Sequence, residues 1–279
     1  MSLAIIRRSI IRNWPDIVAR ANVRPEALDA LPNVPRILGS GTKTEKGEGK
    51  GYLTAVVYMS PATEAFEPGD GRTLCPRSTH GCASACLGAK AGRMVMRPVK
   101  LSRLWKATLY LGDRQLWRLL VRAELTSFER RAARKGLRPV VRIDGSTDTG
   151  EGAGFAPEFP EIQFYDYTKV SARAAKWARG GYAANYHLTF SFSGANAAAS
   201  QAALSAGVNV AAVFSTGKGE ALPAWYDGSL TGCVIDGDVT DLRFLDPSDG
   251  QLVGLRFKAA KGRTVALEKA MAEGFVLPA

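Results

Sequence analysis

The residues with the clearest potential for chemistry are three cysteines, Cys75, Cys82 and Cys86, which lie within twelve consecutive positions. Six residues separate the first two and three separate the last two. Thiolates are strong ligands for soft metals, and three of them on one short loop can bind a metal ion or an iron–sulfur cluster. Gly81 and Gly88 give the loop the backbone freedom to wrap around such a group. The pattern predicts a metal site, and a [4Fe–4S] cluster is the leading interpretation.

Other interpretations of the cysteines stay open at this point. A zinc ion could take the three thiolates together with His80, which lies inside the loop, or with Cys233. The cysteines could also be small buried side chains or form a disulfide. The N-terminus has an apolar stretch too short and too interrupted by arginine for a signal peptide, so we expect a cytoplasmic protein, in which disulfides are disfavoured.

Polar side chains follow the apolar segments that come after the cysteine loop. Such segments are predicted as strands at 139–143, 162–165, 187–192, 208–214, 233–235 and 252–257. Because the carboxyl ends of parallel strands meet at one face, we expect the polar groups and the cysteines to form a single site. The candidate contacts to a cofactor are Asp144, Ser146 and Asp148, and the candidate catalytic residues, for proton transfer or substrate contact, are Asp166, Lys169 and Asp236.

The same strand ends allow a different chemistry. Asp144, Asp166, Asp236 and Asp238 could together hold the metal ions of a hydrolase. Polar residues also begin loops and cap helices, so any one of them could be purely structural.

The order of predicted elements indicates the fold class. A buried strand is predicted at 52–59, directly before the cysteine loop, and helices are predicted at 101–111, 114–135, 171–178 and 195–206. Strands that alternate with helices favour a mainly parallel sheet. We therefore expect an α/β protein with a partial (β/α)6 TIM-like barrel over residues 36–279, preceded by an N-terminal helical extension of three short helices over residues 1–35.

The composition is that of a globular protein with a basic surface. The chain has 37 Lys and Arg against 26 Asp and Glu, a formal net charge of +11, and many of the arginines fall on the helix predicted at 114–135. Such a balance favours contact with polyanions, so nucleic acid is a candidate partner through the basic helices. No apolar run reaches the roughly 18 residues needed to span a bilayer, so a membrane is not expected as a partner.

Several segments resemble a family of phage and mobile-element proteins known as gene product 88. They are the cysteine loop, the strand end Arg-Ile-Asp-Gly-Ser-Thr-Asp at 142–148, the string Phe-Tyr-Asp-Tyr-Thr-Lys at 164–169, the strand at 187–191 and the stretch 234–247. The resemblance covers nearly everything from about residue 36 onward. It implies no particular activity, because the family name carries none.

The cysteine loop also resembles, more distantly, the radical S-adenosylmethionine superfamily. Those enzymes place three cysteines in the loop after the first strand of a partial (β/α)6 barrel. The resemblance implies a [4Fe–4S] cluster on Cys75, Cys82 and Cys86, with S-adenosylmethionine on the remaining iron. It implies a radical S-adenosylmethionine-like enzyme acting on nucleic acid or a nucleotide-derived substrate. The alternative is a non-enzymatic nucleic-acid-binding protein stabilised by zinc or a cluster.

Overall fold

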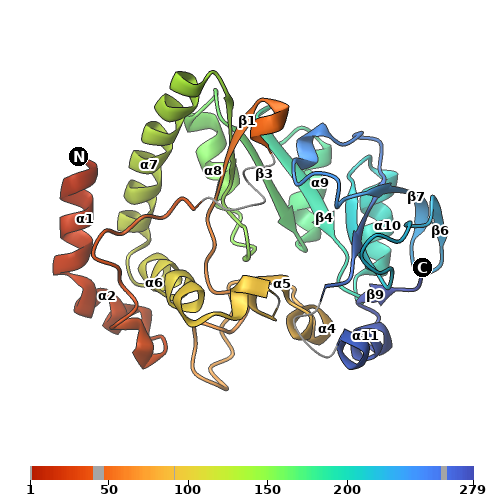
Figure 1. The fold of residues 1–279 in the computed structure, drawn as a ribbon, viewed down its shortest axis with the longest axis horizontal. Coiled ribbons are helices and arrows are strands. Elements are labelled where there is room, and N and C mark those ends of the chain that lie inside the picture. The colour runs from red at the N-terminus through yellow and green to blue at the C-terminus, as the bar shows by residue number, and fades with distance from the viewer. Residues whose placement is uncertain (1, 40–46, 91, 259–262) are drawn as a thin grey trace.

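A curled, mostly parallel sheet forms the centre of the molecule (Figure 1). The computed structural model describes residues 2–39, 47–90, 92–258 and 263–279. Within these ranges the strands are β1 (Tyr52–Val56), β2 (Arg138–Arg142), β3 (Gln163–Thr168), β4 (Tyr186–Ser191), β5 (Val210–Phe214), β6 (Trp225–Asp227), β7 (Thr231–Asp236), β8 (Leu252–Arg256) and β9 (Val276–Leu277). They follow the spatial order β1-β2-β3-β4-β5-β8-β7-β6, and β9 pairs with β5 off this path.

Helices occupy most of the connections between the strands. In the described ranges they are α1 (Leu3–Arg12), α2 (Trp14–Ala21), α4 (His80–Ser84), α5 (Leu87–Lys90), α6 (Arg97–Gly112), α7 (Arg114–Lys135), α8 (Gly152–Phe155), α9 (Ser171–Ala178), α10 (Ala197–Ser205) and α11 (Arg263–Ala272). Single turns of 3-10 helix are η1 (Pro25–Ala27), η2 (Glu48–Lys50), η3 (Gly92–Val95), η4 (Ala156–Glu158) and η5 (Arg243–Leu245). None of these helices is both long and apolar enough to cross a membrane.

The predicted α/β class is confirmed, and the sheet is a half-barrel. Strands β1 to β5, β8 and β7 pair in parallel, whereas the short β6 runs antiparallel to β7. Along the described chain β1 and β6 end the path, so the strand pairing leaves the sheet open and does not confirm a TIM-like barrel. Each of the predicted strands overlaps an observed one, and the half-barrel brings their carboxyl ends to one edge.

The long helix α7 has the bounds that the sequence predicts. The Asp113 carboxylate caps its first turn by accepting a hydrogen bond from the backbone N–H of Leu116 at 2.9 Å. At the other end Gly136 adopts a left-handed conformation, φ 64°, which side chains with a Cβ disfavour. Between them one face is buried against the core, including Leu120 and Phe128.

The N-terminal helices pack directly on the helices of the half-barrel. Helix α1 contacts α7, and α2 contacts α6. The buried Ile10 and Trp14 belong to the same apolar cluster as Trp117 of α7. Arg7 forms an ion pair with Glu124 of α7 at 2.9 Å. The third helix expected in this extension is only the 3-10 turn η1, in which the backbone N–H groups of Ala27 and Leu28 donate to carbonyl oxygens three residues earlier.

Candidate functional site

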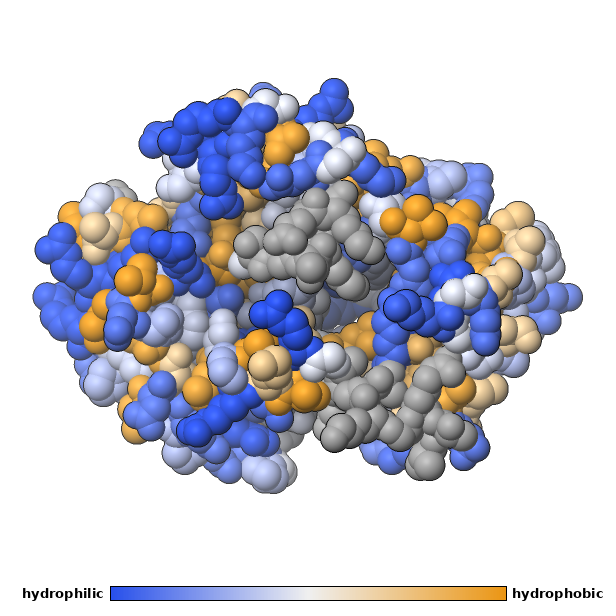
Figure 2. Space-filling model, viewed as in Figure 1, coloured by the Kyte–Doolittle hydropathy of each residue, from blue (hydrophilic) through white to orange (hydrophobic). Residues whose placement is uncertain are grey.

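A cavity of about 700 Å³ lies where the cysteine loop meets the ends of the parallel strands. Its wall contains all three clustered cysteines together with Ser146, Asp148 and Lys169 from the strand ends. Figure 2 shows that the face viewed is hollowed near its centre. Of the six strand-end residues predicted for the site, these three line the cavity, whereas Asp144, Asp166 and Asp236 do not.

The cysteine loop is held by hydrogen bonds that leave the thiols in the cavity wall. Thr79 caps α4 by accepting from the backbone N–H of Cys82 at 3.2 Å, and its hydroxyl donates to the carbonyl oxygen of Ser193 at 2.7 Å. The sulfur of Cys75 accepts from the N–H of Ala62 at 3.1 Å, and its thiol lies 3.6 Å from the carbonyl oxygen of Ser146. Helix α4 is therefore tied to the loop that follows β4, and Cys75 to the loop that follows β2.

Burial governs the acidity of these thiols. It raises the pKa of Cys75 to about 12, although the positive charge of Lys169 acts in the opposite direction. Burial also raises the pKa of Cys86, and the neighbouring Cys82 adds to the effect. Without a bound cation, Cys75 is therefore a neutral thiol at physiological pH.

Two potential fourth ligands lie away from this wall. His80 points to solvent, with 76% of its side chain exposed, and its Nδ1 lies 2.7 Å from Oε1 of Glu273. Cys233 is exposed on β7, in register with Trp225 of β6. Neither residue lines the cavity. The cavity wall therefore holds three of the four cysteines.

The described part of the chain contains no three His, Cys, Asp or Glu side chains grouped closely enough to hold one metal ion. In a cluster each thiolate binds a different iron atom, so the sulfurs stand farther apart than around one ion.

Asp144 lies beneath the loop that follows β2 and organises it. Its buried carboxylate accepts hydrogen bonds from the Thr147 hydroxyl at 2.7 Å, the Thr149 hydroxyl at 2.8 Å and the Gly150 N–H at 2.7 Å. These bonds occupy both oxygens of the carboxylate. Asp144 thereby holds the loop that presents Ser146 and Asp148 to the cavity.

Asp148 and Lys169 connect the ends of two neighbouring strands. The Asp148 carboxylate accepts from the Thr168 hydroxyl at 2.9 Å, the N–H of Lys169 at 2.8 Å and the guanidinium of Arg173 at 2.6 Å. Burial raises the pKa of Asp148 despite these bonds. The ammonium of Lys169 lies 3.3 Å from the hydroxyl of Ser191. Both side chains are thus oriented by contacts within the wall.

Asp166 is buried on the side of β3 that faces α8. One oxygen accepts from the N–H of Asp144 at 2.7 Å, and the other has no hydrogen-bond partner among the described residues. A Cβ added to Gly152 would come within 2.1 Å of that second oxygen. Burial and the nearby charge of Asp144 raise the pKa of Asp166 well above its ordinary value. Burial beneath the loop therefore favours the protonated form of Asp166.

Asp236 lies at the exposed end of β7. It forms an ion pair with Arg256 at 2.9 Å, and its neighbour Asp238, which does line the cavity, forms ion pairs with Arg256 and Lys258. The four carboxylates considered for a hydrolase thus fall into two groups, Asp144 with Asp166 beneath the β2 loop and the other two at the end of β7.

The cavity wall also contains three residues that were not predicted for the site, Tyr58, Tyr167 and Asp241, which lie near Arg142. The guanidinium of Arg142 stacks over the ring of Tyr167, 4.3 Å from its centroid. Alternation along β3 is the signal that could have found Tyr167, because it shares a face with Tyr165 inside the half-barrel. Asp241 follows β7 in a loop, where no periodicity points to it.

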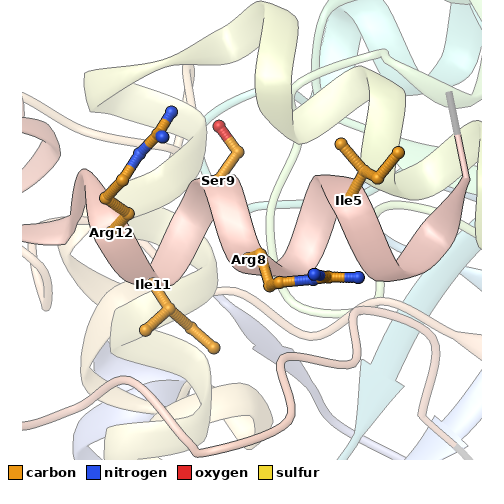
Figure 3. A pocket seen from close by; sticks show the side chains of 5 residues that line it. All are labelled: Ile5, Arg8, Ser9, Ile11 and Arg12. Atoms are coloured by element: carbon orange, nitrogen blue, oxygen red, sulfur yellow. The ribbon is translucent and has the colours of Figure 1, made fainter.

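A second hollow lies on helix α1 (Figure 3). Its wall consists of Ile5, Arg8, Ser9, Ile11 and Arg12, all from this one helix. No strand end or cysteine contributes to it. The hollow is therefore a feature of the outer surface of the N-terminal helix, separate from the cysteine cavity.

Comparisons with curated proteins and with solved structures gave no match. A family model described as gene product 88 matches residues 37–272, which is most of the chain and includes the cysteine loop and the strand ends around the cavity. The protein thus belongs to the gene product 88 family.

Proposed function

We propose that this chain is an iron–sulfur protein in which Cys75, Cys82 and Cys86 hold a [4Fe–4S] cluster. The proposal rests on one observation, the presence of all three thiols in the wall of a single cavity at the carboxyl ends of parallel strands. This edge is where α/β proteins place their active sites. On this basis the protein acts as a radical S-adenosylmethionine-like enzyme on nucleic acid or a nucleotide-derived substrate.

The chemistry of the donor set fits a cluster. Three soft sulfur ligands are available, and although burial raises the pKa of Cys75 and Cys86, the positive charge of Lys169 opposes that effect. Three cysteines also leave one iron open to another ligand. Such a cluster would supply the electron for the reductive cleavage of S-adenosylmethionine.

The residues around the thiols have separate tasks in this proposal. Ser146 and Asp148 contact the cofactor from the wall, and Asp144 positions them through the loop that it holds. Lys169 contacts the substrate or transfers a proton, since it is the predicted catalytic residue that lines the cavity. Asp166 supports this side from beneath, through the backbone of Asp144.

Non-enzymatic binding of nucleic acid is a second candidate, favoured by the exposed basic end of α7. Arg114 and Arg118 pair with Glu151, which removes them as free contacts. By contrast, Arg130 and Arg134 are exposed and have no ion pair within the described residues. A phosphate backbone could meet this end of α7 without entering the cavity.

The metal content of protein purified without oxygen tests the leading proposal. We expect about four iron and four sulfide per chain. Cys82→Ala should remove the cluster, whereas the matched change Cys233→Ala should leave it in place, because Cys233 lies outside the cavity. One zinc without sulfide would overturn the cluster and favour a structural metal. Equal loss of iron from both variants would make Cys233 a ligand.

A separate measurement tests the cofactor. S-adenosylmethionine should shift the electron paramagnetic resonance signal of the reduced cluster, and dithionite should drive its cleavage to 5′-deoxyadenosine. Asp148→Asn should weaken both responses without loss of iron, because Asp148 lines the cavity without being a proposed ligand. An unchanged signal would leave a cluster protein that does not use S-adenosylmethionine.

A further inference from the structure

We propose that Arg142 binds the phosphate or carboxylate group of a small ligand in the deep part of the cavity. The inference deepens the proposed function by naming a class of substrate, and it rests on that proposal only in taking this cavity as the active site. The anion site itself needs no cluster, because it is made by side chains already in place.

The charges in the cavity wall favour an anion. Four basic residues line it, and two of them, Arg256 and Lys258, form ion pairs with aspartates. The other two, Arg142 and Lys169, have no ion pair within the described residues. Among the carboxylates that line the cavity, Asp241 alone likewise has no ion pair within those residues. Two unpaired cations against one unpaired carboxylate leave a net positive wall.

The orientation of Arg142 leaves its binding face available. Its Nε donates to the carbonyl oxygen of Asp144 at 3.2 Å, and the guanidinium is stacked on Tyr167. Neither terminal nitrogen of Arg142 has a hydrogen-bond acceptor among the described residues. A fixed planar guanidinium donates two parallel hydrogen bonds to a carboxylate or phosphate, and that geometry gives both strength and specificity.

Two tyrosines beside Arg142 can add further donors. Tyr58 and Tyr167 line the same part of the cavity. Burial raises the pKa of Tyr58 above its ordinary value and that of Tyr167 to about 12, so both keep their hydroxyl protons at neutral pH. Phenolic hydroxyls donate hydrogen bonds to anionic oxygens. The polar groups here therefore match an anion better than a cation.

The size and the apolar part of the cavity restrict the rest of the ligand. A volume of about 700 Å³ is typical of sites for a single small molecule. The cavity is also lined by Phe192, Phe257 and Phe275, whose rings can pack against a flat apolar group. We infer that the ligand has the size of one nucleotide, with an anionic group on Arg142 and the remainder toward the phenylalanines.

Titration calorimetry on the metal-free protein tests this site. The probes are inorganic phosphate, malonate as the carboxylate, adenosine 5′-monophosphate, and adenosine as the uncharged analogue. We expect adenosine 5′-monophosphate to bind more tightly than adenosine, and Arg142→Gln to reduce its affinity by at least about tenfold. Arg142→Lys, which keeps the charge but loses the planar fork, should recover only part of it. The affinities for inorganic phosphate and for malonate show whether the site prefers a phosphate or a carboxylate.

Arg179→Gln is the matched control, because it removes the same charge from an exposed position outside the cavity. Its affinity for adenosine 5′-monophosphate should equal that of the wild type. Two results would overturn the anion site. In the first, the wild type and Arg142→Gln bind adenosine 5′-monophosphate with equal affinity. In the second, the wild type binds adenosine as tightly as adenosine 5′-monophosphate. If Arg142→Gln does not fold, the affinity of Arg142→Lys for adenosine 5′-monophosphate and the difference between the two adenosine ligands in the wild type test the site instead. These measurements use metal-free protein, so their outcome does not depend on whether the cysteines bind an iron–sulfur cluster.

Discussion

Gly88 and Ser146 lie so close together that a Cβ added to Gly88 would come within 2.8 Å of the Cβ of Ser146. The same added atom would stand 3.6 Å from the sulfur of Cys86. Ser146 is itself fixed, because its hydroxyl donates to the carbonyl oxygen of Met59 at 2.6 Å. The cysteine loop therefore rests on the loop that follows β2, and the thiols and the strand ends share one wall.

Gly88→Ala should disturb the metal site without removing a ligand. The added methyl group must displace either Ser146 or the loop that carries Cys86, at a cost of about 1–3 kcal/mol in the free energy of unfolding. We expect lower iron content after reconstitution and weaker retention of iron against a chelator. Gly154→Ala is the control, since no atom lies within 4 Å of its added Cβ. Equal iron retention in both variants would contradict the close packing.

The thiol of Cys75 should be slow to react in the metal-free protein. Its pKa of about 12 leaves a thiolate fraction on the order of 10⁻⁴ at pH 8, and the thiolate is the reactive form. Labelling by iodoacetamide, followed by peptide mass spectrometry, should modify the exposed Cys233 first. The rate at Cys75 should rise about tenfold per pH unit below pH 11. Rapid labelling of Cys75 at pH 7 would show that its thiolate is stabilised.

Iron binding should depend on pH for the same reason. A thiol must lose its proton to bind a metal, so a raised folded-state pKa makes the proton harder to remove and weakens binding at low pH. Affinity for ferrous iron should therefore increase from pH 6.5 to pH 8.5. Competition with a chelator, corrected for the chelator's own protonation, measures this. A pH-independent affinity would mean that the ligands are already thiolates.

The sequence predicts the scaffold well because its signals are local. The buried strand before Cys75 and the capped helix α7 are read from residues within one element, and both are confirmed. The strands β6 and β9 span three and two residues, which is too short for periodicity to reveal them. Whether the sheet closes depends on pairing between distant edges, which no local pattern encodes.

The gathering of strand ends beside the cysteines follows from the sequence, whereas the side chains that reach the cavity do not. Residues that follow parallel strands do gather beside the cysteines, as Ser146 and Lys169 show. Sequence position does not, however, tell which way a loop side chain turns. Asp144 turns inward to accept the hydrogen bonds of its own loop, and Asp166 lies on the strand face toward α8, so neither reaches the cavity.

Nucleic-acid binding, if it occurs through α7, should be electrostatic and sequence-tolerant. Affinity for a mixed-sequence duplex should fall steeply with salt, and replacing Arg130 and Arg134 by Gln should reduce the slope of log affinity against log salt by about 1.8. Fluorescence anisotropy at several salt concentrations measures this slope. Arg122→Gln is the control, because Arg122 is already paired with Glu158 at 2.6 Å. A flat salt response would leave the basic charge as solvated surface.

Asp166→Asn should change how stability depends on pH. The folded-state pKa of Asp166 is raised above the unfolded value of about 4 by burial and by Asp144. Between these two values the unfolded chain releases the proton while the folded chain keeps it. The free energy of unfolding therefore falls as pH rises, by about 1.4 kcal/mol per pH unit from this group alone. Asparagine mimics the neutral acid and can still accept from the N–H of Asp144, so the variant escapes that loss.

Urea unfolding of the wild type and the variant between pH 4 and pH 8 isolates this contribution, since other titrating groups cancel in the difference. The variant should gain stability relative to the wild type as pH rises, until the folded-state pKa is reached. Asp236→Asn is the control: the hydrogen bond from Arg256 lowers the pKa of Asp236, so its contribution is complete above about pH 4, and the difference between this variant and the wild type should stay constant over this range. A difference in the free energy of unfolding between wild type and Asp166→Asn that stays constant with pH would mean that Asp166 ionises in the folded protein. Its unpartnered oxygen would then need a cation that the described residues do not supply.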